Sequence, residues 1–113
     1  MTPLEVVRAF NQAVELHDPA AVAALVTEDA VFESTGAPDG ELFQGRSEIL
    51  RFWGRFFESN PAATFLIEEE LETGDRVVTR WRYSWSDRGY VRGVDLFRVR
   101  DGLVAEKPSY VKG

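Results

Sequence analysis

One acidic residue lies inside a segment that otherwise has the pattern of a half-buried β-strand. Residues 90–100 read YVRGVDLFRVR, and Asp95 stands between two aliphatic side chains. Alternate residues of a strand share a face, so Asp95 falls on the face of Phe97 and Val99, while the arginines occupy the other. A carboxylate in an apolar interior is disfavoured in its charged form, and such groups often act as general acids or bases. Asp95 is therefore the leading catalytic candidate; a structural acid, ion-paired or hydrogen-bonded, is the alternative.

Lys107 is a candidate partner for Asp95 on the last predicted strand. In that segment, 103–113, Lys107 has the same parity as Val111, so it faces inward if Val111 does. An Asp95–Lys107 pair would keep the carboxylate ionised and favour base over acid chemistry, or a purely structural role. Because lysine is seldom fully buried, the prediction is instead that Lys107 is solvated at the rim of a cavity.

An aromatic stripe lies on the strand that precedes Asp95. Trp81, Tyr83 and Trp85 alternate with polar or basic residues, so one face of this strand is aromatic. These rings are predicted to line a ligand cavity in which the Tyr83 hydroxyl donates a hydrogen bond. Core packing or a dimer face are the alternatives, because aromatic stripes usually become buried.

Ser34 and His17 complete the set of chemically interesting side chains. By alternation with Phe32, Ser34 is predicted to face the same cavity, where it could orient a water or a substrate carbonyl. No base lies beside it, so a serine nucleophile is not expected, and bonding to its own loop is the alternative. His17 is expected in an exposed turn, because a lone histidine makes no site.

Composition excludes several classes of partner. The 113 residues suit one domain, and 44% hydrophobic with 28% charged residues is ordinary for a globular protein. A net charge of −6 argues against nucleic acids and anionic membranes. There is no cysteine, no histidine cluster and no glycine-rich phosphate loop, so neither a metal nor a cofactor is expected. Neither a signal pattern nor a membrane-length apolar run is present, which predicts a cytoplasmic protein.

The periodicity changes from helical to alternating near residue 63. Helices are predicted over 2–18, 18–26 and 46–60, with a short strand at 30–34 and a loop at 35–45 between the last two. Four strands follow, separated by turns at Gly74-Asp75, Asp87-Arg88-Gly89 and Asp101-Gly102. The acidic run at 68–72 is predicted to be a solvated strand face that protects a sheet edge. The expected fold is α+β, with three N-terminal helices packed on a curved antiparallel sheet.

This order of elements resembles the nuclear transport factor 2-like superfamily and, more narrowly, its SnoaL-like domains. The resemblance covers nearly the whole chain, as a single domain over 1–113. It rests on three stretches: HDPAAVAALVTEDAVFES, FQGRSEILRFW and GVDLFRVRDGLVAEKPSYV. It implies a cone-shaped α+β barrel and a homodimer. It does not imply one function, because isomerases, cyclases, hydrolases, dehydratases and non-catalytic binders share this fold.

The ketosteroid isomerases of this superfamily allow a comparison by position. Their late-strand aspartate corresponds to Asp95, their first-strand base to Ser34 and their helix tyrosine to Phe10; a supporting tyrosine corresponds to Trp53. One of the three key groups is kept, so steroid isomerisation by that mechanism is not expected. The SnoaL-like cyclases resemble the chain more closely, because they keep an acid on the late strand as the central acid/base.

The resulting hypothesis is a cofactor-free isomerase or cyclase that acts on a small hydrophobic carbonyl compound. Asp95 would transfer the proton, and Tyr83 or Ser34 would polarise the oxygen. A non-catalytic small-molecule binder and a dimerisation module of the same fold are the alternatives. The remaining ligand-binding residues are predicted to be Phe10, Val14, Phe32, Trp53, Phe57, Trp81, Phe97 and Lys107.

Overall fold

A computed structural model describes residues 1–86 and 89–113 of the chain. Its elements in chain order are α1 (Pro3–Glu15), α2 (Pro19–Ala24), β1 (Val26–Glu33), β2 (Leu42–Gln44), α3 (Arg46–Ser59), β3 (Thr64–Thr73), β4 (Arg76–Ser86), β5 (Gly89–Arg100) and β6 (Leu103–Val111). The predicted turn at Asp87-Arg88-Gly89 involves Asp87 and Arg88, which lie outside the described residues.

The first two helices begin at the caps that the sequence predicts. Thr2 Oγ1 accepts a hydrogen bond from the Glu5 amide at 3.1 Å, and Glu5 Oε1 accepts one from the Thr2 amide at 2.9 Å. This capping box satisfies amides that would otherwise have no partner at the helix start. Asp18 caps α2 in the same way, through the Ala21 amide. The inward face of α1 is then free to bury aliphatic and aromatic side chains.

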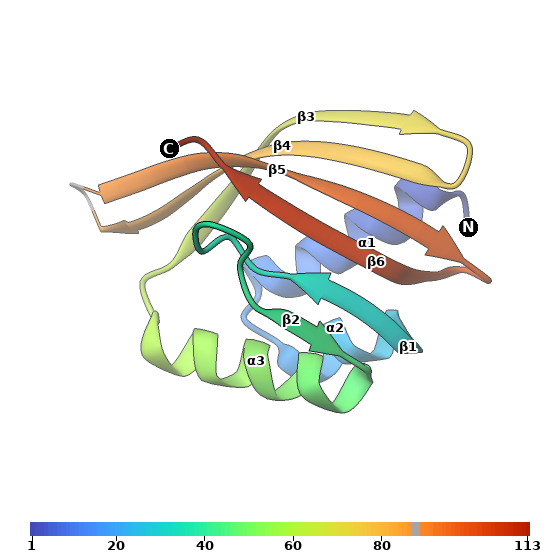
Figure 1. Cartoon of the computed structure of the whole chain (residues 1–113), viewed down its shortest axis with the longest axis horizontal. Helices are drawn as coiled ribbons and strands as arrows, with labels where there is room; N and C mark the ends of the chain where they lie inside the picture. The colour runs from blue at the N-terminus through green and yellow to red at the C-terminus, as the bar shows by residue number, and fades with distance from the viewer. Residues whose placement is uncertain (87–88) are drawn as a thin grey trace.

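Six strands form one strongly curved sheet (Figure 1) in the order β2-β1-β6-β5-β4-β3. Neighbouring strands run antiparallel except β1 and β6, which are parallel. The helices lie on the concave side of the sheet. The predicted α+β class is confirmed, and β3, which carries the acidic run, is an edge as expected. The sheet keeps two edges, β2 and β3, and does not close into a barrel.

Two details of the sheet differ from the prediction. The 35–45 segment contains the three-residue strand β2, which is too short for an alternation to be recognised among its glycines and prolines. The first strand also begins at Val26 rather than at residue 30, because Val26 pairs with Val104 of β6 and the ladder resumes at Val31 after a register shift that spans the polar residues read as a turn. Because β1 pairs with β6, β6 lies between β1 and β5, inside the sheet.

The hydrophobic core fills the space between α1, α3 and the concave face. Phe10 is fully buried there, with ring centroids 5.8 Å from Phe32, 6.3 Å from Trp53 and 5.5 Å from Phe97. Edge-to-face pairs of this kind add to the stabilisation from burial alone. None of the helices in the described part of the chain is long and apolar enough to cross a membrane.

Candidate functional site

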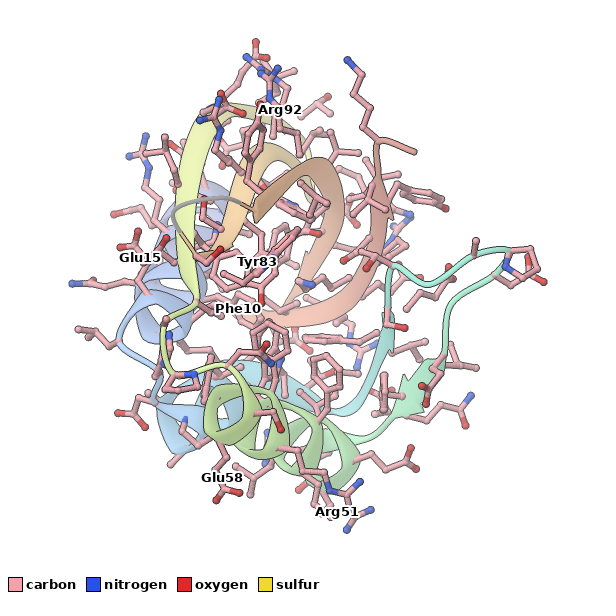
Figure 2. All side chains as sticks on the ribbon, turned by 90° about the vertical axis from the view of Figure 1, so that its left-hand side faces the viewer. Phe10, Glu15, Arg51, Glu58, Tyr83 and Arg92 are labelled. Carbon is pink, nitrogen blue, oxygen red and sulfur yellow. The ribbon has the colours of Figure 1, made fainter. Side chains whose placement is uncertain are left out.

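A cavity of about 120 Å³ opens between the helices and the concave face of the sheet. In Figure 2, Phe10 and Tyr83 lie between the ribbons of helix and sheet, whereas Arg51, Glu58 and Arg92 project outward. Most of the wall is aromatic or aliphatic. The lining residues are Phe10, Asn11, Val14, Glu15, Phe32, Ser34, Thr35, Phe43, Phe52, Trp53, Phe56, Phe65, Ile67, Trp81, Tyr83, Asp95, Lys107 and Ser109.

Asp95 and Lys107 form a buried pair of opposite charges on this wall. Lys107 Nζ lies 3.7 Å from Asp95 Oδ1, and their side chains are 12% and 8% exposed. The prediction that Lys107 is solvated at the rim is therefore wrong. The prediction failed because β1 pairs with β6 and places Phe32 directly beside Lys107. The ammonium group also lies over the rings of Phe32 and Trp53, at 5.4 and 5.5 Å from their centroids.

The rest of the environment of Asp95 is made by hydroxyl residues on the adjacent strands. Thr79 on β4 and Ser109 on β6 are its direct cross-strand partners, and both are buried. Ser109 Oγ accepts a hydrogen bond from Lys107 Nζ at 2.9 Å. Asp95 Oδ1 has no hydrogen-bond partner among the described residues. A buried carboxylate oxygen normally has a hydrogen-bond donor, so this atom has acceptor capacity that no described residue uses.

Two indole groups on the same wall also lack a hydrogen-bond partner among the residues that the structure describes. The buried Nε1 atoms of Trp53 and Trp81 make no hydrogen bond with any described residue, and neither does Nδ2 of Asn11. Buried indole N–H groups usually find an acceptor. Sequence reasoning assigned Trp53 and Trp81 to the wall but treated them as apolar. The signal it missed was that each ring carries a donor that needs a partner once buried.

Gly93 explains how the large ring of Trp81 fits beside Asp95. Gly93 and Trp81 are cross-strand partners. A Cβ atom at position 93 would lie 2.7 Å from Trp81 Cζ2 and 2.3 Å from the Tyr110 carbonyl oxygen. The glycine therefore leaves room for the indole to lie across β5, two residues from the carboxylate on the same face. Trp81 is consequently only 7% exposed, which makes it a cavity residue and not a dimer face.

Tyr83 lines the cavity at some distance from Asp95. It stands four residues along β4 from Thr79, the partner of Asp95, a separation of about 13 Å in an extended strand. Its hydroxyl donates to Asn60 Oδ1 at 3.3 Å, and burial raises the pKa of the phenol. Tyr83 thus stays a neutral donor, but Trp81 is closer to the carboxylate.

Ser34 also lines the cavity and is engaged with its own loop. Its Oγ accepts a hydrogen bond from the Glu41 amide at 2.8 Å, and its amide donates to the Glu41 carbonyl. This is the structural alternative considered for a serine in such a loop. The hydroxyl proton remains available to the cavity.

Two of the predicted ligand-binding residues lie outside the wall. Phe97 is fully buried against Phe10, deeper in the core than the cavity. Phe57 turns toward the end of α1, where its ring stacks on His17 at 4.7 Å. His17 is therefore half-buried rather than exposed, and its Nε2 lies 2.8 Å from the Ala63 carbonyl oxygen. The apolar face of a helix can contact both the cavity and the core. Periodicity identifies the residues on that face but does not tell which of them line the cavity.

The cavity combines apolar walls with a few polar groups, as small-molecule sites do. Asp95 offers an acceptor, while Trp53, Trp81 and Lys107 offer donors. Such an arrangement suits a compact apolar ligand that carries at least one acceptor oxygen. Among the described residues, no three acidic, histidine or cysteine side chains are grouped to hold a metal ion.

Comparisons with known proteins place this geometry in a family. The model of the SnoaL-like domain matches residues 7–107. An NTF2-like protein of unknown function from Mesorhizobium loti is 43% identical, with a TM-score of 0.88 over 98% of this chain and 91% of that one. No curated protein matches the sequence.

More distant solved structures share the fold. A putative polyketide cyclase from Sinorhizobium meliloti has 24% identity and a TM-score of 0.81 over 93% of both chains. A putative ketosteroid isomerase from Kribbella flavida has 21% identity and a TM-score of 0.82 over 96% of this chain and 76% of that one. At these identities the likeness concerns architecture alone. With nearly the whole chain matched by the family model, the protein belongs to the SnoaL-like domain family, with an NTF2-like fold.

Proposed function

We propose that the protein is a cofactor-free enzyme of the isomerase or cyclase type that binds a small hydrophobic carbonyl compound. Asp95 acts as the general base and then returns the proton as an acid. The observation that carries the proposal is a buried carboxylate on an apolar cavity, with one oxygen that has no hydrogen-bond partner among the described residues. Lys107 Nζ lies 3.7 Å from this oxygen, so an acid and an amine stand side by side on the cavity wall.

The substrate carbonyl is held by donors that surround the carboxylate. In this proposal the Trp53 and Trp81 indoles donate to the oxygen while Asp95 removes a proton from the adjacent carbon. The negative charge that develops on the oxygen is stabilised by donors already in place, in a cavity that excludes most water. Ser34 and Tyr83, which also line the cavity, contact the remainder of the ligand.

The size of the cavity limits the ligand. A cavity of about 150 Å³ accommodates one benzene ring in an engineered case, and this one is about 120 Å³. A compact monocyclic or branched ketone fits this volume; a fused tetracycle does not unless the wall moves.

Exchange of the α-protons of cyclohexanone in D₂O, followed by proton NMR, tests the proposal. We expect the wild-type protein to accelerate exchange and Asp95→Asn to lower the rate by about 10²–10⁴-fold, the usual contribution of a positioned base. Asp75→Asn, which changes an exposed turn acid, is the matched control. Equal rates for wild type and Asp95→Asn, with cyclohexanone bound by both, would reject the chemistry.

A non-catalytic binding module is the second candidate. The hydrogen bonds between Ser34 and Glu41 and the contact between Asp95 and Lys107 favour it, because both give structural roles to groups that would otherwise be reserved for chemistry. Retained binding of cyclohexanone without exchange, measured by ligand-observed NMR, is its signature.

A homodimer remains an expectation that follows from the family. Several large apolar side chains are exposed on the described sheet, among them Leu66, Leu71, Tyr90 and Tyr110. Sedimentation equilibrium of the wild type and of Tyr110→Glu tests whether this surface holds two copies together. A monomeric wild type would exclude the dimerisation module.

A further inference from the structure

We propose a second chemical role for this cavity: Lys107 is an amine nucleophile that forms a Schiff base with small aldehydes and ketones. The inference shares with the proposed function the preference of the cavity for carbonyl compounds and the use of Asp95 for proton transfer. It assigns the covalent step to a residue that the acid/base mechanism uses only as a neighbouring charge.

The placement of Lys107 is unusual for a lysine. Its side chain is 12% exposed and lies on the wall of an apolar cavity, flanked by the rings of Phe32 and Trp53. Nζ donates to Ser109 Oγ at 2.9 Å, which fixes the direction of the amine. Lysines that form imines are typically held in desolvated pockets of this kind, where a carbonyl group can reach them and bulk water cannot.

Asp95 supplies the proton transfers that imine formation needs. Its Oδ1 lies 3.7 Å from Nζ and has no hydrogen-bond partner among the described residues. The carboxylate first takes a proton from the ammonium group. The free amine then attacks the carbonyl carbon, and one of its two protons moves to the carbonyl oxygen, which gives a neutral carbinolamine. Asp95 returns its proton to the carbinolamine hydroxyl, which leaves as water while the nitrogen lone pair forms the C=N bond. The ammonium and the carbonyl compound thus become an iminium and water, with charge conserved.

The surroundings that hold the ammonium also suit the product. An iminium carries the same positive charge at nearly the same place, so the Asp95 carboxylate and the faces of Phe32 and Trp53 continue to stabilise it. A site built to hold a neutral amine would not stabilise the positive charge of the iminium product in this way. The cavity of about 120 Å³ limits the carbonyl partner to a small aldehyde or ketone.

The chain provides its own control, because Lys107 and Lys112 are its two lysines and Lys112 is exposed. Wild-type protein is treated with propanal and sodium cyanoborohydride, and the propylated sites are located by peptide fragmentation in a mass spectrometer. We expect Lys107 to be modified at least tenfold faster than Lys112, although burial alone would make it slower. Modification of Lys112 and the N-terminus with Lys107 slower or unmodified would overturn the proposal.

Two variants assign the mechanism. Asp95→Asn should lower the rate at Lys107 at least tenfold and leave Lys112 unchanged, whereas an unchanged rate at Lys107 would remove Asp95 from the step. Lys107→Arg keeps a cation beside Asp95 and should show no modification in the cavity. Because a substitution at a buried pair can unfold the protein, the wild-type ratio of the two lysines decides the proposal by itself. Cyclohexanone exchange without trapping at Lys107 would support the proposed function and reject the Schiff base.

Discussion

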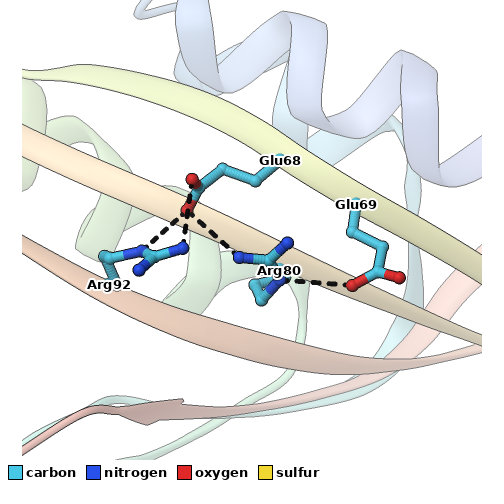
Figure 3. Close-up of polar contacts among 4 residues, drawn as sticks. All are labelled: Glu68, Glu69, Arg80 and Arg92. Carbon is cyan, nitrogen blue, oxygen red and sulfur yellow. Dashed lines mark hydrogen bonds and ion pairs between the residues drawn. The ribbon is translucent and has the colours of Figure 1, made fainter.

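Both faces of the central sheet carry ion pairs between acidic and basic side chains, but the pairs differ in their exposure to solvent. On the concave face, Asp95 and Lys107 are almost completely buried beside the cavity. On the other face of β3, β4 and β5, Glu68 and Glu69 meet Arg80 and Arg92 (Figure 3). There the Arg80 and Glu69 side chains are 42% and 52% exposed, and Arg92 donates two hydrogen bonds to Glu68.

The difference lies in the free energy that each pair costs to remove from water. Exposed pairs gain little, because water and salt screen them. A buried pair must offset a large desolvation penalty, and an apolar pair of the same shape is often equally stable. The outer network therefore gives the sheet a polar surface at little cost, while the inner pair carries a desolvation penalty that the proposed chemistry would account for.

The largest expected effect comes from removing one ion on each face. Lys107→Met leaves Asp95 as a buried, uncompensated charge and should lower the free energy of unfolding by roughly 3 kcal/mol. Arg92→Met removes a partner that is 37% exposed and leaves Glu68 in contact with Arg80, so it should lower the urea midpoint much less. Urea titrations followed by far-UV circular dichroism measure both; similar losses in the two variants would erase the distinction between the faces.

A double substitution sharpens the same point. Asp95→Asn combined with Lys107→Met removes both inner charges and should recover most of the stability lost in Lys107→Met alone. If the double variant is as unstable as the sum of the single ones, the two residues are not energetically coupled.

Packing on the concave face is the next test. Gly93→Ala places a Cβ against the Trp81 ring and the Tyr110 carbonyl, so it should cost about 1–3 kcal/mol and change the fluorescence of Trp81. Gly54→Ala is the control, because nothing lies within 4 Å of that position in α3; it should stabilise by up to about 1 kcal/mol. Unchanged stability in Gly93→Ala would mean that the indole does not lie across β5.

The indole donors allow a smaller test of ligand binding. Replacing Trp53 or Trp81 by Phe removes a hydrogen bond worth about 1 kcal/mol and should weaken cyclohexanone binding about fivefold. Trp85→Phe changes a ring that is 44% exposed and should have no effect. Titrations observed through the indole N–H signals distinguish the three rings, and equal responses from all of them would contradict the assignment.

The smallest effect concerns pH on the outer face. The hydrogen bonds from Arg92 hold the pKa of Glu68 below its ordinary value. Because the folded-state pKa is lowered, the stabilisation by Glu68 is present above the ordinary pKa of about 4.3 and is lost as the pH falls through the lowered value. Melting temperatures of wild type and Glu68→Gln should therefore converge in acid, and also in high salt. A difference that grows in acid would reverse the sign of this argument.

The inward position of Asp95 could be predicted because strand alternation is a local property. The same rule placed Phe32, Trp81 and Ser34 on the correct side of their strands. Lys107 was misjudged because its burial depends on β1 lying beside β6, which no local pattern reports. Whether the Trp53 and Trp81 indole N–H groups find hydrogen-bond acceptors depends on contacts between distant segments, so it could not be predicted from the sequence either.

By itself, the sequence determined the order of the elements other than β2, the caps of the first two helices and the inward faces of the strands that carry Phe32, Trp81 and Asp95. These features follow from backbone geometry, capping chemistry and the period of apolar residues, all of which act over a few neighbouring positions. Tertiary structure decided the parallel pairing of β1 with β6, the contact of Asp95 with Lys107 and the boundary between cavity and core. Those outcomes depend on how a curved sheet brings remote side chains together, and the nature of the candidate site depends on them.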